Sequence, residues 1–156
     1  MALYTCDRNG LNEILQGSPE TWKTDVLRMA SATINSLIEE FPDERLQIIE
    51  KDILMQYGLV IGYKCAQAEL RYNQLRRYVD EIKNIEQSED KIIRLKMFRV
   101  HLLHGYSRQQ KELESFYKFI DGIIKSNKVE DEKDFEAFVH LIDSITAHFE
   151  AFRCDN

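Results

Sequence analysis

Hydrophobic residues recur along this chain in steps of three and four, the spacing that places side chains on one face of an α-helix. The clearest stripe predicts a helix over about residues 131 to 152. A seam this aromatic lies either in the core of a bundle or against another subunit, and the core is the more common place for it. The residues of the seam are Phe135, Phe138, Ile142, Ile145, Phe149 and Phe152.

The first long helix is expected to start at Ser18 and Pro19, because serine caps helix N-termini and proline fits the first helical position. It is expected to end at Phe41, since the residue before a proline avoids the helical region and Pro42 follows. Its apolar face consists of Trp22, Val26, Met29, Thr33 and Leu37.

A second helix is expected to begin at Asp43. Gly58 and Gly62 are candidate interruptions of the segment that follows it, because glycine weakens a helix interior. The residues expected to turn inward are Leu46, Ile49, Ile53 and Leu54.

The middle of the chain carries an amphipathic stripe with polar residues on its other side. Two starting points are open for this helix: Asn73 caps it, or it runs unbroken from about Lys64. The stripe consists of Leu75, Tyr78, Val79, Ile82 and Ile85.

Two further helices follow. Ser88 is expected to cap a helix over about 89 to 105, which Gly105 ends. The segment Ser107-Arg-Gln-Gln110 has the form of a capping box for the next helix, which is expected to stop near Ser126 and Asn127. That helix is expected to bury Leu113, Phe116, Tyr117, Ile120 and Ile124.

These stripes predict an all-α fold, a single helical bundle of about five to six helices over residues 1–156. The chain has only 6 Gly and 2 Pro, whereas strands joined by tight turns would need more of both. Its length suits one domain. The N-terminus lacks the basic start and apolar run of a signal peptide, and no stretch is long and apolar enough to span a bilayer. We therefore expect a cytoplasmic protein with no membrane partner.

The sequence offers no support for an enzyme, a cofactor or a metal site. Cys6, Cys65 and Cys154 lie too far apart in sequence for a typical zinc site or disulfide framework. His101 and His104 are three apart on a predicted helix, but the chain lacks the paired Glu-x-x-His motifs of metal-binding bundles. No phosphate-binding glycine loop is present.

The formal net charge of −6 is distributed unevenly. Residues 1–63 have a net charge of −5 and residues 109–156 also have −5, whereas residues 64–108 have 10 Lys and Arg against 6 Asp and Glu, a net charge of +4. Acidic ends disfavour general nucleic-acid binding, but a basic middle can hold a polyanion along one face.

Cations of this basic block are the candidate phosphate contacts. A helical wheel places Lys96 and Arg99 inside an apolar arc made by Ile92, Leu95, Leu103 and Tyr106. Each cation there either extends its charged end to solvent or meets an anion, with a phosphate-bearing partner as one such anion. The candidate RNA-binding residues are Arg76, Arg77, Lys83, Arg94, Lys96, Arg99 and Arg108.

Three segments carry a resemblance to one family. Leu70-Arg-Tyr-Asn-Gln-Leu-Arg-Arg-Tyr-Val-Asp-Glu-Ile82 is similar to its Thr-Thr-Ser/Thr-Gln-Leu-Arg-Lys segment and the apolar residues after it. Leu95-Lys-Met97 followed by Gly105-Tyr-Ser-Arg108 resembles its Leu-Lys-x-Lys…Gly-Arg helix end. Phe135-x-x-Phe138-x-x-x-Ile142 through His148 resembles its closing helix. The family is the small all-helical subunit of type III-A CRISPR effector complexes, the Csm small subunit, and the segments keep its order and spacing over about residues 70–152.

The resemblance implies a non-catalytic subunit that works with other CRISPR effector subunits. Such subunits stack side by side along the crRNA–target RNA duplex and touch the RNA backbone through basic helix faces, while cleavage belongs to neighbouring subunits. The III-B and III-D small subunits are alternatives for the subtype. A different function class is also open: a helical protein–protein adaptor that uses the acidic ends and the aromatic seam, with no RNA role.

Overall fold

The structure is a computed structural model that describes residues 31–153, with side chains from Ile34 onward. Some predictions concern residues outside this range. They are the helix start at Ser18 and Pro19, the part of its apolar stripe before Thr33, and the statements on Cys6 and Cys154. Within it the chain forms six α-helices, one short 3₁₀ helix and no strand, which confirms the all-α prediction. The elements are α3 (Ser31–Glu39), η1 (Leu46–Ile48), α4 (Lys51–Gln67), α5 (Tyr72–Glu86), α6 (Lys91–Arg108), α7 (Gln110–Lys125) and α8 (Glu132–Phe152).

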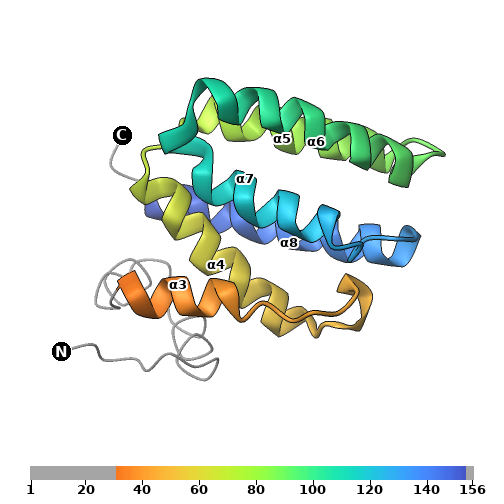
Figure 1. The fold of residues 1–156 in the computed structure, drawn as a ribbon, viewed down its shortest axis with the longest axis horizontal. Coiled ribbons are helices and arrows are strands. Elements are labelled where there is room, and N and C mark those ends of the chain that lie inside the picture. Colours follow the sequence, from red (N-terminus) through yellow and green to blue (C-terminus); the bar gives the residue numbers. More distant parts are fainter. Residues whose placement is uncertain (1–30, 154–156) are drawn as a thin grey trace.

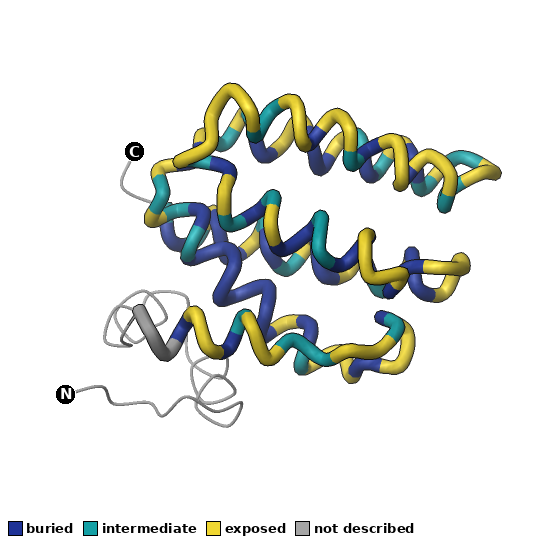
Figure 2. The backbone as a smooth tube through the Cα atoms, viewed as in Figure 1, coloured by how far each residue is buried: buried dark blue, intermediate teal, exposed yellow. Residues whose placement is uncertain are grey.

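The helices form three layers. α5 and α6 run side by side on one side of the molecule, α7 and α8 lie in the middle, and α3 and α4 lie on the other side (Figure 1). α6 packs on α7, α5 packs on α8, and α4 packs on both middle helices. Buried residues concentrate between the layers (Figure 2).

The aromatic seam of α8 is part of this core. Each of its six residues, from Phe135 to Phe152, is buried by other parts of the same chain, with at most 6% of its surface exposed. The alternative that the seam faces another subunit is therefore wrong. The remaining buried apolar residues come from every layer, so α8 serves as the central helix of the bundle.

The two glycines of α4 do not interrupt it, contrary to the prediction. α4 continues through both, and both lie against α8, the helix with which α4 makes its most extensive contact. A Cβ atom added at Gly62 would lie 2.8 Å from the backbone oxygen of Ile145 and 2.8 Å from the backbone nitrogen of Phe149. A Cβ atom at Gly58 would lie 2.0 Å from the Oγ atom of Ser144. Glycine is required here because two helix backbones approach closely.

The junction between α4 and α5 differs from both starting points considered for α5. α4 ends at Gln67, and Glu69 takes a left-handed conformation with φ of 62°. The Leu70 amide donates to the Cys65 carbonyl and the Glu69 amide donates to the Ala66 carbonyl, which is the Schellman arrangement. α5 then begins at Tyr72, so neither an Asn73 cap nor an unbroken helix from Lys64 is correct.

The other predicted helix ends shift as well. α6 starts at Lys91 after Asp90, and the Ser88 hydroxyl donates to the Ile85 carbonyl of the preceding helix instead of capping α6. Gly105 does not end α6, which continues to Arg108. Ser107 lies inside α6 and donates to the Leu103 carbonyl, so the predicted capping box does not form.

The segment from Asp43 to Glu50 is not the start of a helix, although Leu46 and Ile49 are buried as expected. Arg45 and Asp134 fix it to the start of α8. The fully buried carboxylate of Asp134 accepts hydrogen bonds from Arg45 Nε at 2.8 Å, from the Gln47 amide at 3.1 Å and from the Glu130 amide at 2.9 Å. These long-range hydrogen bonds to Asp134 hold the segment in place of the helix that periodicity alone predicted.

We expect Gly62→Ala to destabilise the protein and Gly122→Ala to stabilise it. At Gly62 the new methyl group meets two backbone atoms, which cannot move without shifting α8, so the cost is on the order of 2 kcal/mol. At Gly122, also inside a helix, a Cβ atom would meet nothing within 4 Å, and the higher helix propensity of alanine should add about 1 kcal/mol. Chemical denaturation of both variants measures the difference; equal changes at the two positions would contradict the close packing of α4 on α8.

We expect stability to fall in acid because of Asp134. Burial acts to raise its pKa, but the hydrogen bonds from the Glu130 amide, Arg45 and the Gln47 amide hold the pKa below its ordinary value. A depressed pKa stabilises the fold above about pH 4, the pKa of an unfolded aspartate, and this contribution is lost as the pH falls through the folded-state pKa. Asp134→Asn should cost on the order of 2 kcal/mol at neutral pH, with the difference from wild type shrinking in acid.

Denaturation at a series of pH values tests this expectation. The matched control is Glu136→Gln, which removes an exposed carboxylate that lies in the same helical turn and forms no ion pair within the described residues, and which should leave the acid limb of the stability curve unchanged. An unaltered acid limb in Asp134→Asn would show that another group controls the loss.

Candidate nucleic-acid interface

The structure separates the predicted phosphate contacts into two groups. Three of the cations are held by carboxylates of the same chain: Lys83 Nζ lies 2.8 Å from Asp143, Arg94 Nε lies 2.9 Å from Asp90, and Arg99 Nε lies 2.7 Å from Asp121. These ion pairs reduce the net positive charge that the cations present to a ligand.

Lys96 and Arg99 do not lie in the apolar arc of α6, contrary to the wheel prediction. The face of α6 that is buried consists of Leu95, Phe98 and Leu102. Lys96 is exposed, and Arg99 lies at the edge of the buried face. The anion that Arg99 meets is Asp121 of α7. Helical periodicity could not identify it, because the two residues are 22 positions apart in sequence.

The remaining four predicted residues form no close ion pair with a carboxylate of the described residues. Arg76 Nε lies 3.9 Å from Asp80 Oδ2, which is a long distance for an ion pair. The guanidinium carbon of Arg76 lies 6.0 Å from the centroid of the Tyr72 ring. Arg77, Lys96 and Arg108 are exposed and form no ion pair with any carboxylate of the described residues. An exposed arginine without an internal carboxylate is available to an external anion.

Two of these residues converge on one cavity with a third arginine. Arg77 from α5, Arg108 from the last turn of α6 and Arg71 from the α4–α5 turn line a cavity of about 300 Å³. We call this cavity the arginine recess. Arg71, which also forms no ion pair within the described residues, is its N-terminal member. The recess is completed by Asn73, Gln74, Tyr78, Gly105 and Gln109.

Local structure explains why these side chains meet. The Schellman turn at Glu69 reverses the chain, so α5 starts beside the place where α6 ends. Arg71 is the N-cap residue of α5, no side chain caps that helix end, and its first turn has no acidic residue. The helix macrodipole therefore adds positive potential at the recess.

Gly105 and Tyr78 form the inner wall. A Cβ atom at Gly105 would lie 1.7 Å from the Tyr78 hydroxyl oxygen, so only glycine leaves room for the tyrosine in this position. Burial raises the pKa of Tyr78 above its ordinary value, and the positive charges of Arg77 and Arg108 offset this only in part. The Tyr78 hydroxyl is thus protonated near neutral pH, so it can donate a hydrogen bond to an anion bound in the recess.

Sequence reasoning missed Arg71 and the three amide side chains of the recess, Asn73, Gln74 and Gln109. Arg71 lies in the segment that resembles the family, but nothing in the local pattern marks it as a site residue. Its role as a neighbour of Arg108 depends on the turn at Glu69, which has no glycine to mark it. The recess also adjoins a cavity of about 590 Å³ that shares Arg71 and Asn73 with it, where the Arg153 guanidinium lies 5.0 Å from the Tyr72 ring centroid.

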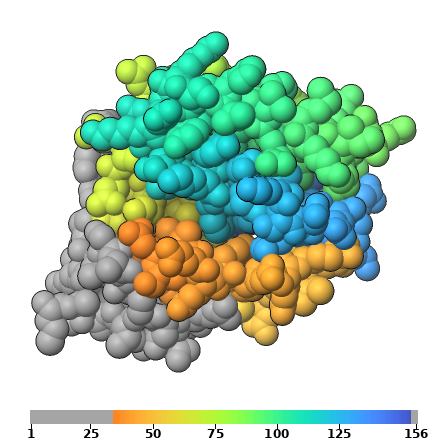
Figure 3. Space-filling model, viewed as in Figure 1, coloured from red at the N-terminus to blue at the C-terminus, as the bar shows by residue number. Residues whose placement is uncertain are grey.

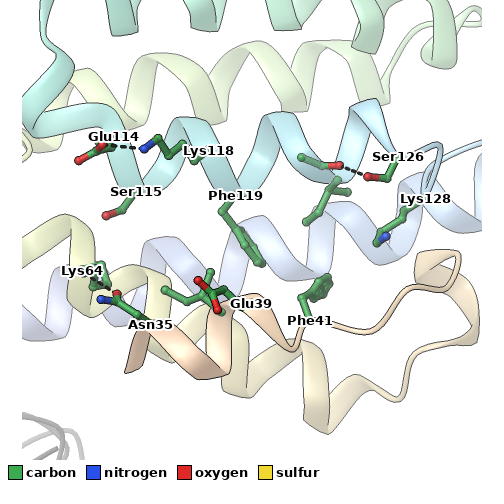
Figure 4. Close-up of a pocket in the computed structure, with 13 residues that line it drawn as sticks. Asn35, Glu39, Phe41, Lys64, Glu114, Ser115, Lys118, Phe119, Ser126 and Lys128 are labelled. Atoms are coloured by element: carbon green, nitrogen blue, oxygen red, sulfur yellow. Dashed lines mark hydrogen bonds and ion pairs between the residues drawn. The ribbon is translucent and has the colours of Figure 1, made fainter. Parts of the chain in front are cut away.

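A larger groove lies between α3 and α7, with a volume of about 680 Å³ (Figure 4). Each lysine that lines the groove donates a hydrogen bond to another side chain of the protein. Lys64 donates to Asn35 at 3.2 Å, Lys118 to Glu114 at 2.8 Å, and Lys128 to Asp43 at 3.1 Å. The groove presents no group of free cations, and we therefore take the smaller arginine recess as the candidate site.

No set of three or more residues that could hold a metal ion occurs among residues 31–153. His101 Nδ1 instead lies 2.7 Å from Glu81. Cys65 is fully buried, and burial raises the pKa of its thiol to about 12. Over the same part of the chain no helix has the length and apolar character needed to cross a bilayer.

The fold and the recess together define an all-helical protein with a compact arginine cluster at one end. Residues 50–154 match the model of the family described as Csm2 Type III-A, so the chain belongs to that family, the small subunits of type III-A CRISPR effector complexes. The family match confirms the resemblance and the III-A subtype. A search of curated proteins and a search of solved structures found no match.

The Arg99–Asp121 pair yields a test of whether Arg99 is structural. We expect a double-mutant cycle with Arg99→Ala and Asp121→Ala to give a coupling energy of about 1 kcal/mol, because the pair is partly exposed, with 37% and 17% of the two side chains accessible. Denaturation of the four chains measures it. The same cycle on Arg94 and Asp90, a fully surface pair, is the control and should give less; a coupling near zero at Arg99 would show that the pair does not hold Arg99 in place.

Proposed function

We propose that this small subunit binds the backbone of the crRNA–target RNA duplex through the arginine recess. The observation that carries the proposal is the convergence of Arg71, Arg77 and Arg108, which have no carboxylate partner in the described structure, in a member of the Csm2 family. Arg76 and Lys96 are supporting contacts. Lys83, Arg94 and Arg99 stay predicted contacts, and each would have to leave its carboxylate to reach RNA.

The chemistry of the recess suits a phosphate better than a base. Guanidinium groups, amide nitrogens and a protonated tyrosine hydroxyl are all donors that phosphate oxygens accept. Contacts of this kind supply affinity without reading sequence, which is what an RNA-guided complex requires of a subunit that meets many different guides and targets. The subunit itself contributes binding, and the resemblance assigns cleavage to its neighbours in the complex.

A polyanion that runs past one end of each subunit also accounts for the uneven charge. The acidic ends would repel RNA from the rest of the surface and confine it to residues 64–108, where the net charge is +4. Side-by-side copies along the duplex would each contribute one recess, as the resemblance implies for this family.

The test is a double substitution, Arg77→Ala with Arg108→Ala. Loss of two phosphate contacts should weaken binding by a similar factor for unrelated RNA sequences and reduce the log–log salt slope by up to about two units. Both residues are exposed and lie within helices, so helicity and melting temperature should stay unchanged. RNA affinity is measured by fluorescence anisotropy over a salt series, with the subunit free and in the assembled complex.

The matched control is Lys125→Ala with Lys133→Ala. It removes the same two charges from exposed helical positions in the acidic C-terminal block, where we expect no RNA contact. Equal losses in both double variants would mean that overall charge, rather than the recess, determines binding. Unchanged affinity in the Arg77 and Arg108 variant would leave the protein–protein adaptor as the better account.

A further inference from the structure

A small cavity of about 190 Å³ adjoins the arginine recess and shares three of its side chains, those of Arg71, Gln74 and Gln109. Two carboxylates, those of Glu69 and Glu112, complete its lining. We call it the glutamate cavity. It lies at the end of the molecule where α4 ends, α5 begins and α6 joins α7 (Figure 1, Figure 3). The recess thus continues into a second space whose lining has a different chemistry.

The side chains of the glutamate cavity make no hydrogen bond or ion pair with any described residue. Glu112 is the third residue of α7, a position from which a glutamate often accepts a hydrogen bond from the amide of the N-cap residue. Here the Gln109 amide donates to the Gly105 and Tyr106 carbonyls instead. Glu69 has a φ of 62°, which glycine adopts more readily, so the turn itself does not require a glutamate. Both carboxylates therefore have hydrogen-bonding capacity that the fold does not use.

The two cavities offer opposite hydrogen-bonding partners. The guanidinium groups of the recess are donors only, whereas an ionised carboxylate is an acceptor only. A phosphate fits the first cavity and would be repelled by the second. The glutamate cavity therefore fits an uncharged group that donates a hydrogen bond and is attached close to a phosphate. In RNA the ribose 2′-hydroxyl is such a group, and it is displayed beside the backbone along the minor groove of an A-form helix.

We propose that Glu69 and Glu112 accept a hydrogen bond from the ribose 2′-hydroxyl next to the phosphate that the arginine recess binds. The inference rests on the proposed function, since the bound phosphate is what places the sugar beside the glutamate cavity. Arg71 lines both cavities and binds the phosphate at the boundary between them. The 2′-hydroxyl is the group by which a protein distinguishes RNA from DNA at a given position. The glutamate cavity thus makes the subunit selective for RNA without reading the bases.

The test compares an RNA duplex with a duplex of the same sequence in which fluorine replaces each 2′-hydroxyl. The fluorinated duplex keeps the phosphates and the A-form shape but has no 2′ donor. The full-length wild-type chain should bind the RNA duplex on the order of tenfold more tightly, the effect of one hydrogen bond to a charged acceptor. In Glu112→Ala most of this difference should disappear, because the acceptor is removed. Fluorescence anisotropy at constant salt measures both affinities.

The matched control is Glu89→Ala. It removes an exposed carboxylate that forms no ion pair within the described residues, from the turn between α5 and α6. Loss of this negative charge should strengthen the binding of both duplexes by the same small factor and leave the ratio of the two affinities unchanged. Glu69→Ala repeats the test at the other carboxylate in case Glu112→Ala lowers stability, which the melting temperature reports.

Equal affinity of the wild-type chain for the two duplexes would overturn the inference. So would variants at Glu69 and Glu112 that change both affinities by one factor, since the carboxylates would then act through charge alone. The proposed function fails in a different way. Unchanged binding of both duplexes by Arg77→Ala with Arg108→Ala would overturn the recess and this inference together. A loss of affinity in that double variant, with the wild type binding both duplexes equally, would overturn this inference alone.

Discussion

α4 and α8 approach so closely at Gly58 and Gly62 that the backbones of the two helices are in contact. Added Cβ atoms would overlap Ser144 and the backbone between Ile145 and Phe149. This approach brings the aromatic seam of α8 against the tyrosine- and aliphatic-rich side of α4, and the pair then provides the surface on which α5 and α7 pack. The positions of α5 and α6, and therefore of the recess, depend on this contact. A side chain at either glycine would separate the pair and loosen each layer built on it.

Periodicity predicted the helices well where burial of apolar side chains determines their position. It predicted them less well where hydrogen bonds determine where a helix begins or ends. The stripes of α5 and α8 are buried as predicted because each helix has one apolar face directed at the core, and so is the stripe of α7 except for Tyr117, which is only partly buried. The end of α7 at Lys125 lies close to the predicted stop near Ser126 and Asn127, and Asn127 takes the left-handed conformation that asparagine tolerates. The same conformation at Glu69 was invisible, because glutamate does not signal it. Gly105 was misassigned as a helix end for a related reason: it is needed for the approach of Tyr78, a contact that no local pattern reveals.

The region of the candidate site could be predicted from the sequence, but the set of residues that forms the site could not. Counting charge located residues 64–108, and the resemblance singled out the same segment. Which cations are available there depends on partners that lie far away in sequence, such as Asp121 for Arg99 and Asp143 for Lys83. Arg108 appeared to lie past the end of its helix, whereas the extra turn of α6 carries it to the wall of the recess. Tertiary packing determines which arginines of this basic stretch are left without an ion pair, and a single sequence does not reveal those contacts.

α6 belongs both to the core and to the proposed RNA contact. Its last turn supplies Arg108 to the recess, while Leu95, Phe98 and Leu102 hold the helix to the core. α6 contains no acidic residue, and a carboxylate in its last turn would repel the phosphate that we propose the recess to bind. Because the buried face of α6 determines where its last turn lies, packing far from the recess fixes the position of Arg108 in it.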